Sequence, residues 1–171
     1  MLIKTIEENY KKKLPRFEML SKDETCTVFH IENNTGDGYM SFYELFDGIY
    51  LLFMDCHIEN VDECCTVCLG KDVMEINHCR EGRIECISKS GKSVYLGKGD
   101  FQISFCDLHF CSASFPTTHY HGVTIMIDYS EITNQVKEFL NSFDINVDVL
   151  HKKLYKADHW WLLRRNENIE H

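Results

Sequence analysis

Short apolar stretches that end at glycines fill the middle of the chain. Residues 73–105 contain the segments VMEINHC, RIECIS, KSVYLG and FQISF, and the breaks between them fall at Gly82, Gly91 and Gly99. Regularly spaced β segments with a glycine at each break predict an antiparallel meander that closes into a barrel or sandwich. Tight turns of this kind favour a positive φ, which glycine adopts readily. Because small barrels often enclose one cavity of ligand size, the pattern also points to an internal binding site.

Further strand-like segments flank this meander. They read TCTVFHIE, YMSFYELF and IYLLFMDCHI before it, and HYHGVTIMIDY after it. A turn cluster occupies residues 33–38, and Asp47-Gly48 is a strong hairpin signal between two of the segments. Residues 26–129 are therefore expected to form a barrel. Residues 1–25 are polar and predict an N-terminal arm rather than part of the core.

The spacing of the apolar residues changes after Ser130. In SEITNQVKEFLNSF they recur at helical spacing, and Ser130 is placed to cap the helix. A second helical piece, VDVLHKKLYK, follows, so residues 130–171 are expected to form a helical segment and the start of a linker. The predicted fold class is mainly β with C-terminal helices (α+β).

Composition narrows the function. The chain has 171 residues, a net charge of −9 and a pI near 5.4, which suits one domain and disfavours direct nucleic-acid binding, since phosphate contacts need clustered Lys and Arg. No stretch is apolar for long enough to span a bilayer, and charges interrupt the N-terminus where a signal peptide would be apolar. We therefore expect a cytoplasmic protein with no membrane partner.

Nine cysteines leave two readings open. The group Cys64, Cys65 and Cys68 resembles half of a zinc knuckle, but a structural zinc site needs a second ligand pair at a defined spacing. The favoured reading is free thiols, several of them small core residues, because the count is odd and no export signal is present.

Two segments resemble a known family. EINHCREGRIECISKSGKSVYLGKGDFQIS, followed by SFPTTHYHGVTIMIDYSEI, is similar to the N-terminal sensor half of AraC-type transcription regulators, closest to the branch that responds to siderophores and similar small effectors. The similarity covers roughly residues 35–171. Its most specific parts are the EGR turn, the GD step and the pattern P…Y.G.TI.ID.

The resemblance implies a cupin-like double-stranded β-helix that binds a small-molecule effector, followed by two helices that form a homodimer. On the residues alone, the helices could equally pack on their own barrel, and both can hold. Family members continue into a basic domain with helix-turn-helix motifs, which is absent from this chain. DNA is therefore expected as a partner only through that missing domain.

No catalytic constellation stands out in the sequence. Enzymatic cupins hold a metal with two histidines one residue apart, a glutamate and a later histidine, and the nearest candidates ahead of Gly82 are His57 and Glu63. His119 and His121 form an H-x-H pair that could reach one ion from a shared strand face, or could be a plain surface pair. We predict no enzyme activity, no catalytic residue, no cofactor and no metal site.

Aromatic and polar residues of the strands are the candidates for the ligand pocket. Strand alternation on YMSFYELF separates two faces but does not say which points inward, and the aromatic residues could instead merely fill the barrel. The predicted ligand-binding residues are Tyr43, Phe53, His57, Asn77, His119 and Tyr120.

Two functions from different classes follow. The favoured one is the effector-sensing and dimerisation domain of an AraC-type regulator. The alternative is a free-standing metal-binding cupin or cupin enzyme, which stoichiometric Fe, Mn, Ni or Zn at His119 and His121 would favour.

Overall fold

The structure of the protein, a computed structural model, describes residues 7–8, 16–62, 72–88, 91, 93–105, 110–155 and 160–165. The cysteine group Cys64, Cys65 and Cys68 lies outside the described residues, as does Glu63.

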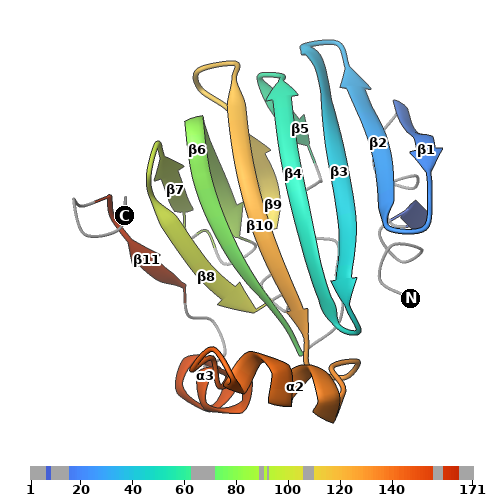
Figure 1. The fold of residues 1–171 in the computed structure, drawn as a ribbon. Coiled ribbons are helices and arrows are strands. Elements are labelled where there is room, and N and C mark those ends of the chain that lie inside the picture. Colours follow the sequence, from blue (N-terminus) through green and yellow to red (C-terminus); the bar gives the residue numbers. More distant parts are fainter. Residues whose placement is uncertain are drawn as a thin grey trace.

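Antiparallel strands form one large, curved main sheet (Figure 1). Its strands follow the order β1–β2–β3–β4–β10–β6–β8–β11. Their bounds are Arg16–Lys22 for β1, Cys26–Asn33 for β2, Gly36–Phe46 for β3, Ile49–His57 for β4, Tyr120–Asp128 for β10, Val73–Ser88 for β6, Phe101–Phe105 for β8 and Trp161–Leu163 for β11.

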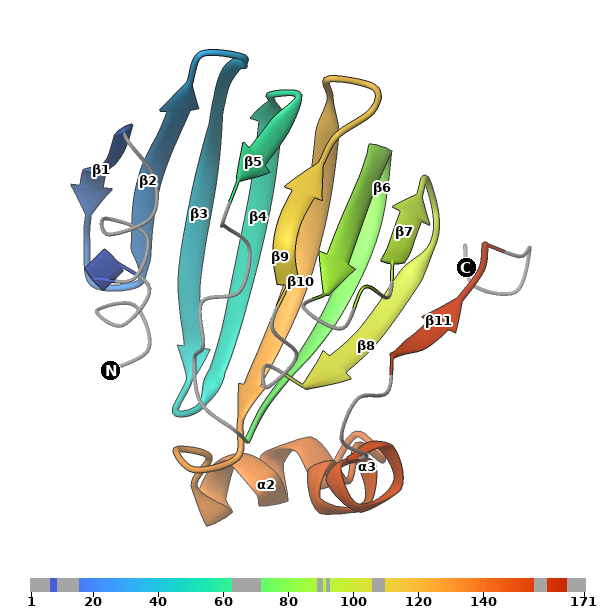
Figure 2. The same cartoon turned by 180° about the vertical axis from the view of Figure 1, so that it is seen from behind.

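A smaller second sheet lies against one face of the main sheet and is seen in front of it in Figure 2. It contains β5 (Asn60–Asp62), β9 (Phe110–Ser114), the C-terminal half of β6, and β7 (Ser93–Gly97). The larger core cluster joins buried residues of both sheets, such as Met40 and Phe42 on β3 with Leu96 on β7. The predicted fold class, mainly β with a cupin-like barrel and two C-terminal helices, is confirmed.

Strand β6 connects the two sheets through Gly82. Residues before this glycine pair with β10 and β8, and residues from Arg83 onward pair with β7 and β9. Gly82 has a φ of +75°, and a Cβ added to it would lie 1.8 Å from the carbonyl oxygen of His119. The predicted chain reversal at residues 80–82 is therefore wrong, because the strand bends here and continues. Gly91 and Gly99 also have positive φ, as expected.

Two short strands extend the main sheet beyond the predicted barrel. β1 lies within the segment expected to be an arm, and its Phe17 is buried, with its ring stacked 4.8 Å from Phe29 on β2. β11 lies within the segment expected to be helical and pairs with β8. The hairpins predicted at residues 33–38 and at Asp47-Gly48 are present.

The helices α2 (Asn134–Asn141) and α3 (Val147–Leu154) lie across one end of the main sheet (Figure 1). Thr133 caps α2, and Ser130 instead donates its hydroxyl to Asp128 Oδ1 at 2.6 Å, so the predicted cap was wrong by three residues. A second core cluster unites the helices with the outer face of β4, β6, β8 and β10; its buried members are Ile49, Met74, Phe105, Ile127, Ile132, Val136 and Val147. No helix among the described residues is long and apolar enough to cross a membrane.

Candidate functional site

A cavity of about 110 Å³ lies between the two sheets. Most of its wall is apolar and comes from β2, β3, β4 and the second sheet. The exception is a row of polar residues that follows the strand pairing across the main sheet: Thr124 on β10 pairs with Asn77 on β6, and Asn77 pairs with Gln102 on β8. Glu75 lines the same wall, two residues before Asn77. An apolar pocket with a few placed polar groups is typical of a small-molecule site.

Tyr120 lies beside this polar row. Its ring is almost fully buried, and its hydroxyl donates to Asn77 Oδ1 at 3.0 Å. Burial raises the pKa of the Tyr120 phenol far above its ordinary value, and the nearby Cys79 adds to the rise. The phenol therefore stays protonated and acts as a fixed donor.

The thiol of Cys79, two residues after Asn77 on β6, shows no sign of nucleophilic activation. Burial, with a smaller contribution from the charge of Asp100, raises the pKa of Cys79 to about 11. A thiol needs a lowered pKa to be a good nucleophile at neutral pH. Among cysteines with described side chains, Cys26, Cys56, Cys79 and Cys86 form no disulfide, which confirms the reading of these four as thiols.

The predicted ligand-binding residues fall into three groups. Asn77 and Tyr120 line the cavity. Tyr43 and Phe53 do not, because the inward face of β3 carries Met40 and Phe42, which leaves Tyr43 on the outer face. There its ring meets Phe53 edge-on, with centroids 5.8 Å apart.

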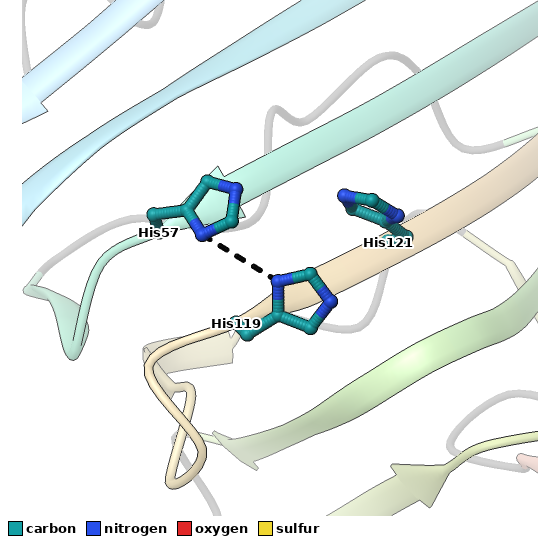
Figure 3. A group of neighbouring side chains, drawn as sticks. All are labelled: His57, His119 and His121. Atoms are coloured by element: carbon teal, nitrogen blue, oxygen red, sulfur yellow. Dashed lines mark hydrogen bonds between the residues drawn. The ribbon is translucent and has the colours of Figure 1, made fainter.

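The third group is His57, the last residue of β4, and His119, which directly precedes β10. Both lie on the outer face beside His121 (Figure 3). One nitrogen from each of these three side chains lies within 4.8 Å of the others, so they could hold a metal ion. Asp55 and Glu81 adjoin the histidines. A groove of about 620 Å³ runs along the same face, and its wall includes His121, Asp55, Glu81, Arg80 and Lys98.

Sequence reasoning missed Glu75, Gln102 and Thr124 as cavity residues. In VMEINHC and FQISF, polar residues alternate with apolar ones, and the usual reading assigns the polar face to solvent. Here the apolar residues Ile76 and Ile103 pack on the helices instead, so the polar face points inward. The one sequence signal that helices would cover the outer face of these strands was the apolar stripe in the helical segment after Ser130.

Comparisons with known proteins leave the family open. No family model matches the chain, and no curated protein matches it. Among solved structures, a cupin 2 conserved barrel domain protein from Salinispora arenicola is similar over 65% of this chain and 82% of its own, with 14% identity and a TM-score of 0.41. A mutant of Bacillus subtilis oxalate decarboxylase is similar over 86% of this chain and 42% of its own, with 14% identity and a TM-score of 0.43.

A HTH_3 family transcriptional regulator from Vibrio cholerae is similar over 52% of this chain, with 17% identity and a TM-score of 0.36. This chain spans 50% of that regulator's length. At TM-scores below 0.5, none of these likenesses carries an argument about the function of this chain.

Proposed function

We propose that this chain is the effector-sensing and dimerisation domain of an AraC-type transcriptional regulator, and that its effector binds in the cavity between the two sheets. The proposal places the protein in the cytoplasm, assigns it no enzyme activity, and leaves DNA contact to a helix-turn-helix domain outside this chain. Its support is the sequence resemblance together with an internal cavity that carries a row of polar side chains.

The hydrogen bond from Tyr120 to Asn77 is the observation that carries the ligand-binding part. It fixes the amide of Asn77 beside an apolar wall, so a ligand can be oriented by one polar edge while its body is buried. An engineered cavity of about 150 Å³ holds benzene, so a cavity of about 110 Å³ favours an effector no larger than about one ring. A siderophore exceeds this size.

Binding of small one-ring compounds tests this assignment. A panel of phenols, amines and carboxylic acids is screened by ligand-observed NMR against the wild-type chain and two variants. Thr124→Phe fills the cavity from its polar wall, whereas Val123→Phe adds the same ring on the outer face. We expect at least one compound to bind the wild type and Val123→Phe but not Thr124→Phe. Equal binding by all three proteins, or no binding by the wild type, would contradict the assignment.

The dimerisation part rests on an apolar surface beside the helices. Phe139 and Phe143 on and after α2 are 46% and 62% exposed, and Phe46 of the β3–β4 hairpin lies against Phe139, with ring centroids 5.3 Å apart. Ile145, between the helices, and Val149 on α3 are also exposed apolar residues. The other apolar residues of the stripe, Ile132, Val136 and Leu140, belong to the core cluster with the sheet, so one face of α2 covers the barrel while another is left for a twin.

Sedimentation of the purified chain tests the dimer. We expect a dimer for the wild type and a shift to monomer for Phe143→Asp, because a charge in the centre of an apolar interface is costly to desolvate. Lys98→Asp, in the turn before β8 and at the opposite end of that strand from Phe105, which packs on the helices, is the control and should remain dimeric. A monomeric wild type at high micromolar concentration would contradict this part.

A metal-binding cupin remains the second candidate, and the three histidines favour it. They lie outside the barrel, however, so a metal bound there would not by itself place chemistry in the cavity. Turnover of a cavity-bound compound, lost in Asn77→Leu, is the result that would favour an enzyme over a sensor.

A further inference from the structure

Two short sequence patterns face each other at one end of the main sheet. His121 on β10 pairs with Asp55 on β4, and Tyr120 pairs with Cys56, which brings His119 opposite His57. Residues two apart on a strand share a face, so Asp55-x-His57 and His119-x-His121 present four side chains to the same side. Cys56 and Tyr120 point the other way, into the cavity.

We propose that His57, His119 and His121 bind one divalent transition-metal ion on the outer face of the barrel, separate from the cavity. This site goes beyond the proposed sensing function and departs from the expectation of no metal drawn from the sequence. It depends on a pairing across β4 and β10 that the sequence did not reveal, because His57 and His119 are 62 residues apart.

Distances between the imidazole nitrogens suit such an ion. His57 Nδ1 and His119 Nδ1 lie 3.5 Å apart. Two nitrogens bound at about 2.05 Å to one tetrahedral ion lie about 3.3 Å apart, so this pair needs only a small adjustment. His121 stands beside both rings, with ring centroids 4.5 Å from His119 and 6.2 Å from His57. The three side chains are 58%, 32% and 37% exposed in the order His57, His119, His121, which leaves the rings free to turn toward an ion.

Two carboxylates complete the surroundings. Asp55 Oδ1 lies 3.2 Å from His57 Nε2 and 2.6 Å from His121 Nε2, although the latter pair is not aligned as a hydrogen bond. Glu81 Oε2 lies 3.4 Å from His119 Nε2 and 4.0 Å from His121 Nδ1. Carboxylates next to ligating histidines orient the rings and raise their basicity, and either carboxylate could serve as a fourth ligand. Their charges also offset that of a bound cation.

The donor set identifies the class of metal. Imidazole-rich sites with a carboxylate suit Zn²⁺, Ni²⁺ and Cu²⁺, whereas Mg²⁺ and Ca²⁺ prefer oxygen ligands throughout. The side of the cluster that holds His121, Asp55 and Glu81 opens into the outer groove, whose wall also holds Arg80 and Lys98. A coordination position on that side is accessible to water or to an anionic ligand.

Titration calorimetry with Ni²⁺ on the metal-stripped chain tests the proposal. All proteins carry Cys64→Ser, Cys65→Ser and Cys68→Ser, so that these thiols cannot supply the signal. We expect one Ni²⁺ per chain, with affinity reduced at least about 30-fold in His119→Gln and in His121→Gln, and about 10-fold in Asp55→Asn, in line with the loss of a ligand or of its orienting partner. Circular dichroism confirms that each variant is folded.

His30→Gln is the matched control. His30 also lies beside carboxylates, with Asp37 Oδ2 at 3.4 Å and Glu18 Oε1 at 3.7 Å, but it does not belong to the histidine cluster. Its replacement should leave Ni²⁺ affinity unchanged. The proposal is overturned if the chain with these three cysteines replaced binds no Ni²⁺ at concentrations up to the millimolar range, or if His119→Gln and His121→Gln bind as tightly as their parent. Either result would leave the cluster as three neighbouring surface histidines without a metal.

Discussion

The two halves of the main sheet use opposite patterns. On β3, Met40 and Phe42 point into the core, while Tyr39 and Tyr43 lie on the outer face. On β6 and β8, the reversed half of the sheet, the order is the opposite. Asn77 and Gln102 point inward, and Ile76 and Ile103 pack outward against the core cluster that contains the helices. The inner face of a sheet is therefore not necessarily its apolar face. Where helices cover the outside, polar residues can be kept for the inside, and here they line a cavity.

The largest effect is expected where β6 leaves the reversed half. Gly82→Val should lower the free energy of unfolding by more than about 4 kcal/mol, since it combines backbone strain with a severe clash. The φ of this glycine is +75°, and a Cβ would lie 1.8 Å from the His119 carbonyl oxygen. Urea denaturation measures the change.

Gly91→Val separates the backbone strain at a positive φ from the steric clash. Gly91 has a similar φ of +78°, but a Cβ there would meet nothing within 4 Å. It should cost about 1–2 kcal/mol, the strain alone. Similar losses for both variants would show that His119 can move aside and that the bend at Gly82 does not depend on close approach.

Truncation of Phe42, a core side chain of β3, is expected to have the next largest effect. Phe42→Ala should destabilise the protein by about 3–5 kcal/mol, because Phe42 is 2% exposed and packs in the larger core. Its neighbour Tyr43 lies on the outer face, so Tyr43→Ala should cost about 1 kcal/mol or less. Thermal unfolding of both variants measures the contrast. Equal losses would mean that the two faces of β3 do not differ as described.

In the reversed half, buried polar side chains affect stability through the hydrogen bonds that they make with each other. Asn77→Leu should cost about 1–3 kcal/mol, since it leaves the buried Tyr120 hydroxyl without its acceptor. Adding Tyr120→Phe removes that hydroxyl and should recover much of the loss, because two matched apolar groups avoid the penalty. A double-mutant cycle in urea gives the coupling. Additive losses would show that the hydrogen bond contributes nothing to stability.

The smallest effect concerns the edge of the reversed half, where Asp100 ties β8 to the segment after β11. Burial raises the pKa of Asp100, but hydrogen bonds from Gly97, Arg165 and Arg164 outweigh it and hold this pKa below its usual value. A carboxyl with a lowered folded pKa stabilises the protein above its unfolded pKa of about 4 and loses that contribution as pH falls through the folded value.

Asp100→Asn should therefore cost about 1 kcal/mol near pH 7 and progressively less below about pH 4. Unfolding of the wild type and the variant across this pH range provides the measurement. A difference that stays constant through the acid range would contradict the role of the charge.

The same contrast explains what the sequence could predict. Strand positions, the hairpin at Asp47-Gly48 and both helices followed from alternation, turn residues and helical spacing, which are local. The inward face of β3 was left open because both of its faces carry aromatic residues. The bend at Gly82 looked like a chain reversal, since both need a glycine with positive φ and only pairing partners distant in the chain distinguish them.

The candidate site was harder to predict for the same reason. Asn77 and Tyr120, predicted as ligand-binding residues, line the cavity, but Gln102 and Thr124 became visible only through their pairing with Asn77. The approach of His57 to His119 likewise depends on the pairing of β4 with β10, across 62 residues.

Occupancy of the cavity is the most direct test of whether a ligand binds between the two sheets. We would determine the crystal structure of the chain after mild purification, and again after soaking with the tightest compound of the one-ring panel. We expect density for a small molecule between the two sheets, within hydrogen-bonding distance of Asn77 or Gln102. A cavity closed by side chains, or a compound found only elsewhere on the protein, would contradict it.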